Sequence, residues 1–258
     1  MSEAMDKTYI SRWHTLVLPG IFTLIVLIIL VTLGVWQLQR LAWKEALIAR
    51  IDARTHANPV AIAPEILWPK LQWNEEEYRP VQVTGKYLYQ DQVFVHANAV
   101  VGMGSARMGY FVLTPLQQEN GSIIIINRGF IPLELKQDTD AFAEWQLKDQ
   151  SMGPVTVTGL LRSPQERGWF VPEDVPAAGE WFTRDPIAIG QAKGLTRIAP
   201  FMIDAASGSV TERWPMGGLT VVSFPNNHLD YAFTWFGLAV VLLVIFIMYA
   251  RKSLRVLP

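Results

Sequence analysis

Two apolar runs without a charged side chain stand near the two ends of the chain. The first covers residues 15–39 and is dominated by Leu, Ile and Val, and the second covers residues 231–250. A helix rises about 1.5 Å per residue, so either run can cross a hydrocarbon core of about 30 Å. A cleaved signal peptide is the alternative for the first run, but its apolar core would span only about 7–15 residues. The pattern therefore predicts two transmembrane helices.

Basic residues set the predicted orientation of these helices. A basic tail follows the second run at once, with Arg251, Lys252 and Arg255. The positive-inside rule places this tail in the cytoplasm, and two crossings bring the N-terminus to the same side. Residues 40–54 also carry several basic side chains and argue for the reverse orientation. Because long segments cross membranes largely regardless of charge, we expect the middle of the chain on the non-cytoplasmic side.

The segment between the two runs changes its hydrophobic period along the chain. Residues 40–54 space apolar side chains at helical intervals, and Asn58-Pro59 is expected to end that helix. Short β-rich runs bounded by Gly, Pro or Asn follow at residues 81–85, 92–96, 111–113, 123–126, 155–158 and 219–224. Asn120-Gly121 is typical of a hairpin turn, and Asp185-Pro186 is typical of a helix start, here of a short helix to Lys193.

These elements predict the fold class. The short runs lack the long helical crossovers that a parallel sheet requires, so we expect antiparallel packing, with a barrel as one form of it. The predicted protein is a membrane protein in which two transmembrane α-helices flank one α+β, mainly antiparallel β domain outside the membrane. Its expected boundaries are a cytoplasmic tail (1–14), the first helix (15–39), a periplasmic domain (40–227), the second helix (228–250) and a basic cytoplasmic tail (251–258).

Composition removes several classes of function. Charged residues make up 17% of the chain, below the roughly 25% usual for soluble proteins. The formal net charge of −1 does not provide the excess of positive charge that is typical of nucleic-acid-binding proteins. The chain has no cysteine, which excludes disulfides, thiolate metal sites and a cysteine nucleophile. Four histidines remain as candidate metal ligands.

The start of the second apolar run carries the most informative candidate residue, His228. On a helix, His228, Tyr231 and Trp235 share a face with Ala232, because they are spaced by three, four and seven residues. The positive end of the helix dipole disfavours the imidazolium, so a ring nitrogen stays free to bind a metal, although Asp230 partly opposes this effect. The simpler alternative is that His228 only forms a hydrogen bond at the lipid interface.

The end of the first apolar run should lie at the same membrane surface. Trp36, Arg40 and Trp43 are spaced by four and seven residues, and Gln37 stands beside Trp36. If the two helix ends meet, a tetrapyrrole there would find His228 for its iron, aromatic faces for its ring and Arg40 for its propionates. Alternatively, Arg40 extends to a lipid phosphate. A haem-like site is thus one of two interpretations that the residues leave open.

Other polar motifs favour structural roles. No nucleophile-elbow pattern accompanies the serine, histidine and aspartate residues, so a hydrolase has no support. Glu75-Glu76-Glu77 is expected to be a solvated loop, and His96 a core or surface residue of a strand. The run Asn127–Pro132 is expected to be a strand-to-turn junction.

An ordered set of short segments resembles the Surf1/Shy1 family of cytochrome oxidase assembly factors. No single segment is specific, but the set and its order between two terminal helices are. The segments are Gly34–Lys44 (GVWQLQRLAWK), Tyr78–Val81 (YRPV), Thr84-Gly85, Thr114–Leu116 (TPL), Asn127–Gly129 (NRG), Val157–Gly159 (VTG), Asn227–Leu229 (NHL) and Thr234–Phe236 (TWF).

The resemblance implies a function without catalysis. It implies that the protein helps to assemble a haem-copper terminal oxidase by binding haem a and delivering it to the catalytic subunit, with His228 as the iron ligand. Implied partners are that subunit, the haem a synthesis enzyme and the lipid bilayer. The alternative is a cofactor-free scaffold for oxidase subunits. Because the N-terminal residues lack an Arg-rich, acid-poor presequence pattern, a bacterial inner membrane is the expected location.

Overall fold

The computed structural model describes residues 2–101, 105–150, 153–207, 214–219 and 226–255, with the backbone alone for residues 2–14 and 255. The chain divides into two compact units. The first consists of residues 1–50 and 223–258, and the second of residues 51–222.

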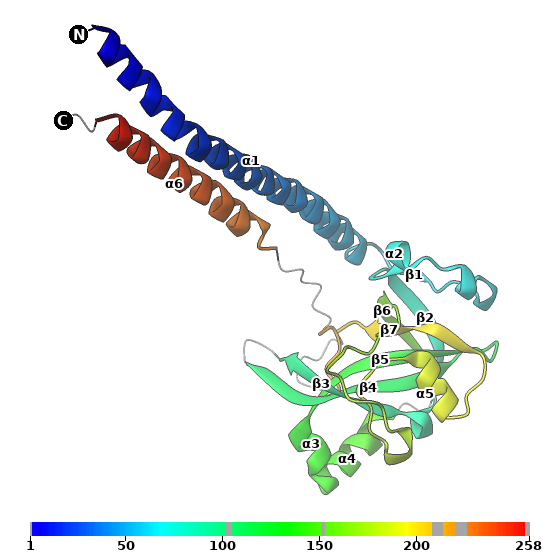
Figure 1. Ribbon diagram of the computed structural model, residues 1–258. Helices are drawn as coiled ribbons and strands as arrows, with labels where there is room; N and C mark the ends of the chain where they lie inside the picture. Colours follow the sequence, from blue (N-terminus) through cyan, green and yellow to red (C-terminus); the bar gives the residue numbers. More distant parts are fainter. Residues whose placement is uncertain (1, 102–104, 151–152, 208–213, 220–225, 256–258) are drawn as a thin grey trace. The chain divides into compact units, whose positions relative to one another are not determined.

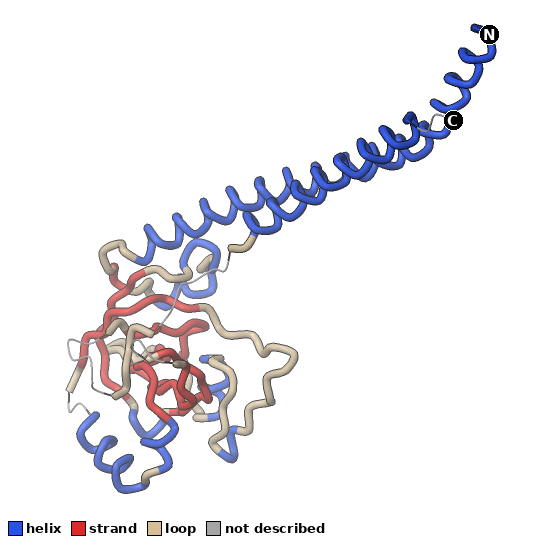
Figure 2. The backbone as a smooth tube through the Cα atoms, turned by 90° about the vertical axis from the view of Figure 1, so that its left-hand side faces the viewer, coloured by secondary structure: helices blue, strands red, loops and turns tan. Residues whose placement is uncertain are grey.

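The first unit is a pair of long helices. Helix α1 covers Ser2–Thr55 and helix α6 covers His228–Arg255. They run side by side in opposite directions, so the first turn of α1 lies at the same end as the last turn of α6 (Figures 1 and 2). The predicted helix at residues 40–54 is confirmed as a direct continuation of α1, which ends at Thr55, just before Asn58-Pro59.

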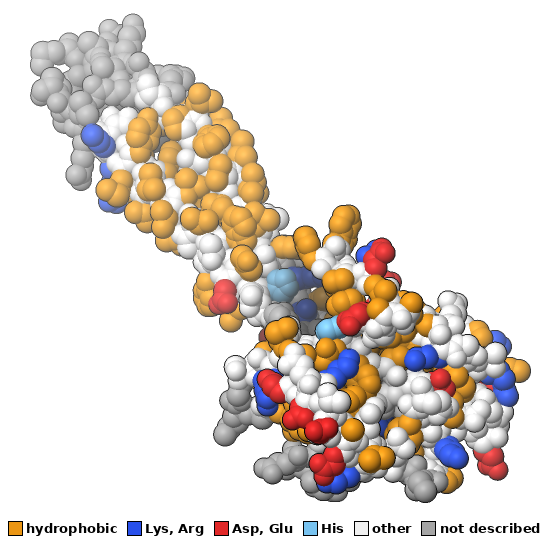
Figure 3. All heavy atoms as spheres, turned by 90° about the horizontal axis from the view of Figure 1, so that it is seen from below, with side chains coloured by type: hydrophobic (Ala, Val, Ile, Leu, Met, Phe, Trp, Pro, Cys, Tyr) orange, Lys and Arg blue, Asp and Glu red, His pale blue; other side chains and the backbone are white. Residues whose placement is uncertain are grey.

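Apolar side chains cover the outside of this helix pair. Leu18, Phe22, Val240 and Met248 are all more than half exposed, and Figure 3 shows hydrophobic side chains over most of the visible surface of the helices. Both helices are long and apolar enough to cross a membrane. Such a surface is stable against lipid tails and unfavourable in water, so the prediction of two flanking membrane helices is confirmed.

The second unit is built around a barrel-like sheet. Its strands lie in the order β1-β2-β6-β7-β5-β4-β3, and an additional pairing of β2 with β4 closes a ring of five strands, β2, β6, β7, β5 and β4 (Figure 1). The strands are β1 (Val60–Ala61), β2 (Pro80–Tyr87), β3 (Val93–Val100), β4 (Ala106–Gln117), β5 (Ile123–Pro132), β6 (Val155–Arg162) and β7 (Ile198–Ala205).

Short helices and turns complete the domain. The α-helices are α2 (Trp73–Glu76), α3 (Leu133–Gln137), α4 (Thr139–Asp149) and α5 (Pro186–Ala192), and the 3₁₀ turns are η1 (Glu65–Lys70), η2 (Tyr89–Asp91) and η3 (Pro176–Ala178). The predicted cap of α5 is confirmed, because the Asp185 side chain accepts hydrogen bonds from the backbone amides of Ile187 and Ala188. The predicted hairpin at Asn120-Gly121 is also confirmed, since it joins antiparallel β4 and β5.

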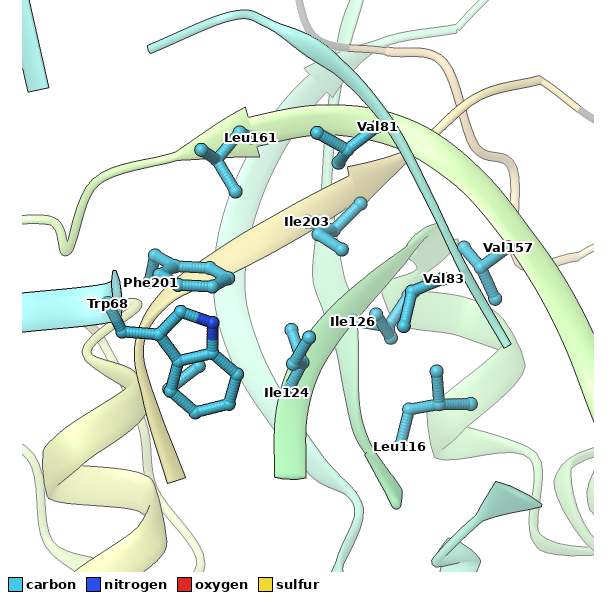
Figure 4. Packing of buried hydrophobic residues seen from close by; sticks show 11 residues of the cluster. Trp68, Val81, Val83, Leu116, Ile124, Ile126, Val157, Leu161, Phe201 and Ile203 are labelled. Atoms are coloured by element: carbon cyan, nitrogen blue, oxygen red, sulfur yellow. The ribbon is translucent and has the colours of Figure 1, made fainter. Parts of the chain in front are cut away.

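Apolar side chains at alternate positions of the strands fill the interior of the barrel. In β2, Val81 and Val83 are buried while Gln82 and Thr84 between them are exposed, as expected for a strand with one face in the core. Trp68 from η1 packs edge-on against Phe201 at a ring distance of 5.3 Å. Figure 4 shows these side chains converging with others from several strands, namely Leu116, Ile124, Ile126, Val157, Leu161 and Ile203.

The sheet departs from the predicted pattern in two respects. β7 was not predicted, and it pairs with β5 in parallel, as β1 does with β2. Pro200 lies inside β7 and masks its strand character, because proline cannot donate to a ladder. The β5–β7 pairing is irregular there, since Ile123 and Ile125 pair with Ile198 and Met202. Of the strand predicted at residues 219–224, residues 220–224 lie outside the described residues.

Candidate functional site at the helix pair

His228 is the first residue of α6, as the sequence predicted for the start of the second membrane helix. The carbonyl of Asn227 accepts a hydrogen bond from the amide of Tyr231, which sets Asn227 at the cap of the helix. The Nδ1 atom of His228 lies 2.7 Å from Oε1 of Gln37 on α1. The two helices therefore touch at the level where the sequence placed the candidate site.

Close packing supports this contact. Gln37 is only 8% exposed, and Gly34 one turn before it is also buried. A Cβ atom on Gly34 would lie 2.7 Å from two ring atoms of Phe236, so the absence of a side chain lets α6 approach α1. Ala232, one turn after His228, is 2% exposed. Small residues thus bring the two backbones together beside the His228–Gln37 pair.

The predicted residues on α1 lie on one flank of this contact. At about 100° per residue, Trp36, Arg40 and Trp43 are rotated by roughly 60–120° around the helix axis from Gln37, all in the same sense. The Arg40 guanidinium lies 4.0 Å above the Trp43 ring, a cation–π contact. Trp36 is 52% exposed. Among the described contacts, none joins Arg40 or Trp36 to His228.

The two predicted aromatic residues on α6 differ in their exposure. Trp235 is half-buried, whereas Tyr231 is 56% exposed and lies outside the contact between the helices. The structure therefore pairs His228 with Gln37 and leaves aromatic and basic side chains outside that pair, namely Trp36, Arg40, Trp43 and Tyr231, which are exposed, and Trp235, which is half-buried.

Gln37 is the member of the site that the sequence reasoning did not assign. A signal for it was present, because an uncharged polar side chain next to an apolar membrane run usually finds a hydrogen-bond partner on a neighbouring helix. Its distance of three residues from Gly34 places it on the same helix face as the closest approach of α6.

The hydrogen bond defines the chemistry available to the imidazole. An amide oxygen can only accept, so Nδ1–H of His228 donates to Oε1 of Gln37. In the neutral form of the ring, this bond leaves the lone pair on Nε2, for which the described residues supply no partner. An imidazole oriented through one nitrogen, with the other free, is the usual form of a histidine that binds a metal.

The barrel wall holds a second polar cluster, which is internally satisfied. Asp204 is 3% exposed and accepts hydrogen bonds from Asn127 Nδ2 (2.8 Å) and Arg162 Nη1 (3.0 Å). Arg162 Nε also donates to Glu77 Oε1 (3.1 Å), and Arg184 Nη1 lies 3.6 Å from Asp204 Oδ1. Burial lowers the pKa of Arg184. Two acids and two guanidiniums balance each other, which favours a structural role in joining β5, β6 and β7.

This cluster corrects the prediction for residues 75–77. Glu75 and Glu76 belong to helix α2 rather than to a loop, and Glu76 pairs with Arg79 at 2.9 Å. Glu77 is mostly buried and pairs with Arg162. The prediction of a solvated loop was wrong because the charge run was judged without its basic partners, one of which is 85 residues away.

His96 occupies the edge strand β3. Its Nε2 lies 2.7 Å from Glu180 Oε2, and its ring stacks on Phe182 at 4.8 Å. The hydrogen bond from His96 lowers the pKa of the Glu180 carboxyl. A hollow of about 190 Å³ lies beside this stack, lined in part by Asn98 and Arg184. Among the described residues, no group of three histidine or acidic side chains could hold a metal ion.

Comparison with known proteins assigns the family. A sequence model of the SURF1 family matches residues 24–240. The chain is 32% identical over 250 residues to Surfeit locus protein 1 of Homo sapiens, which covers 92% of this chain and 76% of that protein. It is 34% identical to Surfeit locus protein 1 of Gallus gallus (88% and 72% covered) and 27% identical to a SURF1-like protein of Caenorhabditis elegans (93% and 76% covered).

The chain is thus a membrane protein with two flanking helices and a barrel-like domain, and it belongs to the SURF1 family. This confirms the family that the ordered segments suggested. The match begins inside the first membrane helix and ends inside the second, so it includes the parts of both helices that meet at His228.

The predicted location is wrong. The relatives come from mammals, a bird, a frog and worms, which points to a mitochondrial rather than a bacterial membrane. The bacterial inner membrane, and with it a periplasmic domain, was inferred from the composition of a short N-terminal segment. The composition of so short a segment is a weak guide to location. The two apolar helices do not decide the question either, because helices of this length fit any bilayer of ordinary thickness.

Proposed function

We propose that this protein acts in the assembly of a haem-copper oxidase by binding haem a at the helix pair and passing it to the catalytic subunit. Membership in the SURF1 family supports a role in oxidase assembly, and it is consistent with a function without catalysis. The delivery of haem is the finer part of the proposal and depends on the chemistry around His228.

The His228–Gln37 hydrogen bond carries the proposal. It orients the imidazole and directs its lone pair to Nε2, the atom that would bind the haem iron. Because the bond links two helices, the ligand is held only when α1 and α6 are packed together. The donor set fits haem, since a neutral imidazole is a common axial ligand of haem iron.

The exposed surface beside the pair suits the rest of a tetrapyrrole. Trp36, Tyr231 and Trp235 offer aromatic faces, and Arg40 offers a guanidinium for a propionate carboxylate. Arg40 already stacks on Trp43, so the charge is kept near the aromatic surface. A ligand surface that is partly open, with one imidazole, suits a cargo that must be released to another protein.

Haem content tests the proposal. The full-length protein, co-produced with the enzymes that synthesise haem a, is expected to copurify with haem, and His228→Ala is expected to lose it or shift its spectrum. His56→Ala is the matched control, because His56 is exposed and contacts Thr55 and Asp52 near the end of α1. Unchanged haem content and spectrum in His228→Ala would refute the role of this histidine.

Oxidase assembly separates this function from that of a cofactor-free scaffold. If haem delivery is the function, cells that carry only His228→Ala should assemble the oxidase poorly although the variant reaches the membrane in normal amounts. A scaffold predicts normal assembly with His228→Ala and failure only when the surface from Trp36 to Trp43 or residues Asn127–Pro132 are disrupted; the latter were predicted as a strand-to-turn junction but belong entirely to β5.

A further inference from the structure

Two adjacent aromatic side chains project from a loop of the barrel domain. Trp169 is 100% exposed and Phe170 is 102% exposed. They occupy the middle of a turn in which the amide of Val171 donates to the carbonyl of Gly168 at 3.0 Å. The turn lies between the end of β6 at Arg162 and the start of η3 at Pro176.

Such exposure is unusual for these residues. Tryptophan and phenylalanine commonly bury most of their surface, and they dominate the energetics of cores and interfaces. Here neither side chain gives the domain any buried apolar area, so the fold does not require them. A large apolar pair at the tip of a turn is typical of a contact made outside the domain.

The base of the loop is tied to the rest of the domain. Gln165 accepts a hydrogen bond from Arg184 Nε at 3.0 Å, and its amide donates to the Arg184 carbonyl. On the returning side, the Asp174 carboxylate accepts from the amide and hydroxyl of Thr183. The turn is therefore presented by two anchored stems, and ordering it on binding costs little conformational entropy.

We propose that this turn inserts Trp169 and Phe170 into the interfacial layer of the membrane that α1 and α6 cross. The domain is joined to a membrane helix at each end of its sequence, so the bilayer is present at a high effective concentration. Tryptophan favours the membrane–water interface because its ring is apolar and its N–H is polar. The turn would then act as a third point of attachment and restrict the orientation of the barrel.

Charge indicates the kind of lipid contact. Arg167 at the base of the turn pairs with Glu173 at 3.4 Å, and Glu166 adds a further negative charge nearby. The tip therefore has no excess of positive charge with which to attract anionic lipids. Insertion is driven by apolar burial, and it is insensitive to salt and to the fraction of anionic lipid.

Site-directed labelling tests the insertion, since the chain has no native cysteine. Full-length protein carrying Phe170→Cys is labelled with a nitroxide and reconstituted into phosphatidylcholine vesicles. Collisions with oxygen, which is enriched in lipid, should exceed those with a water-soluble nickel complex several-fold. The control is Leu147→Cys on α4, an apolar position that is 78% exposed, where the nickel complex should dominate. Trp169→Cys provides a second position in the turn.

Each outcome decides the proposal. The proposal is supported if the labels at positions 169 and 170, but not the label at 147, are protected from the nickel complex, and if salt and anionic lipid do not change this protection. Equal access of the nickel complex to all three positions overturns it. Protection that arises only when the oxidase catalytic subunit is added also overturns it, because the turn would then bind a protein. Haem content is not involved, so failure here is distinct from failure of the proposed function.

Discussion

The glycine at the helix contact gives the sharpest structural prediction. A Cβ atom on Gly34 would lie 2.7 Å from the Phe236 ring, about 1 Å closer than the ordinary carbon–carbon contact of about 3.5–4.0 Å. Gly34→Ala therefore forces the ring aside or the helices apart beside Gln37 and His228. Overpacking of this kind costs about 1–3 kcal/mol, and at about 1.4 kcal/mol per factor of ten this equals a roughly 5- to 150-fold rise in the open population.

The rate of thiol labelling measures this opening. Ala232 lies in the helix contact and is 2% exposed, so a cysteine placed there in a chain without other cysteines reacts only when the contact opens. In this Ala232→Cys background, Gly34→Ala should raise the labelling rate by the factor given above. Adding Phe236→Leu should restore slow labelling, because it removes the ring that the new methyl group meets.

Gly237→Ala is the matched control, since a Cβ atom on Gly237 meets nothing within 4 Å. It changes helix propensity in the same way as Gly34→Ala and adds no clash, so its labelling rate should not rise. Equal rates for Gly34→Ala and the parent, or no effect of Phe236→Leu in the double variant, would refute the close approach of α1 and α6 at this level.

Three further predictions concern the barrel domain. Asp204→Asn should lower the free energy of unfolding by about 3 kcal/mol in denaturant titrations, because it removes the carboxylate that pairs with Arg184 and leaves Arg162 with Glu77 alone. Glu173→Gln on the surface should have little effect, and similar values for both would refute the buried network. Burial raises the pKa of Tyr87 to about 12 from 10, so the unfolded state loses its proton first and stability should fall by about 2–3 kcal/mol between pH 10 and 12. A slope that persists in Tyr87→Phe would contradict this. Gly129→Ala should abolish folding as judged by protease resistance, because Gly129 has φ +125° and its Cβ would lie 2.2 Å from backbone atoms, while Gly153→Ala, which meets nothing within 4 Å, should fold normally.

Local signals in the sequence explain which elements could be predicted. Charge-free apolar runs mark the two membrane helices because the lipid core requires an uncharged helix along the whole segment that crosses it. The alternation in β2 and the Asp185-Pro186 start of α5 were readable for a similar reason, since each depends on neighbours in the chain. Antiparallel pairing followed from short connections such as Asn120-Gly121.

Elements that depend on distant contacts could not be predicted. β7 contains Pro200 and is inserted between β5 and β6, so its strand character depends on partners far away in the sequence. Helix α4 packs on the core mainly through the half-buried Phe142 and Trp145, so its apolar stripe is too short to stand out in the sequence. The role of Glu77 was missed because its partner Arg162 lies 85 residues further along the chain.

The candidate site shows the same limit. Helical spacing placed His228 and the ridge of Trp36 and Arg40 near the two helix ends that meet, but spacing does not give the rotation of one helix against the other. The contact lies at Gln37 and Gly34, and it leaves Tyr231 outside. Only the packing of the two helices identifies the glutamine as the partner of the histidine.

The proposed ligand is tested most directly by removing the His228 side chain and supplying free imidazole in its place. Full-length His228→Gly in lipid nanodiscs is titrated with haem a, with and without free imidazole, and compared with Gln37→Leu, which retains the ligand but loses the hydrogen bond. We expect His228→Gly to lose the wild-type spectrum and free imidazole to restore it, and Gln37→Leu to bind haem about 10–100-fold more weakly. A wild-type spectrum and affinity in His228→Gly without imidazole would contradict the account.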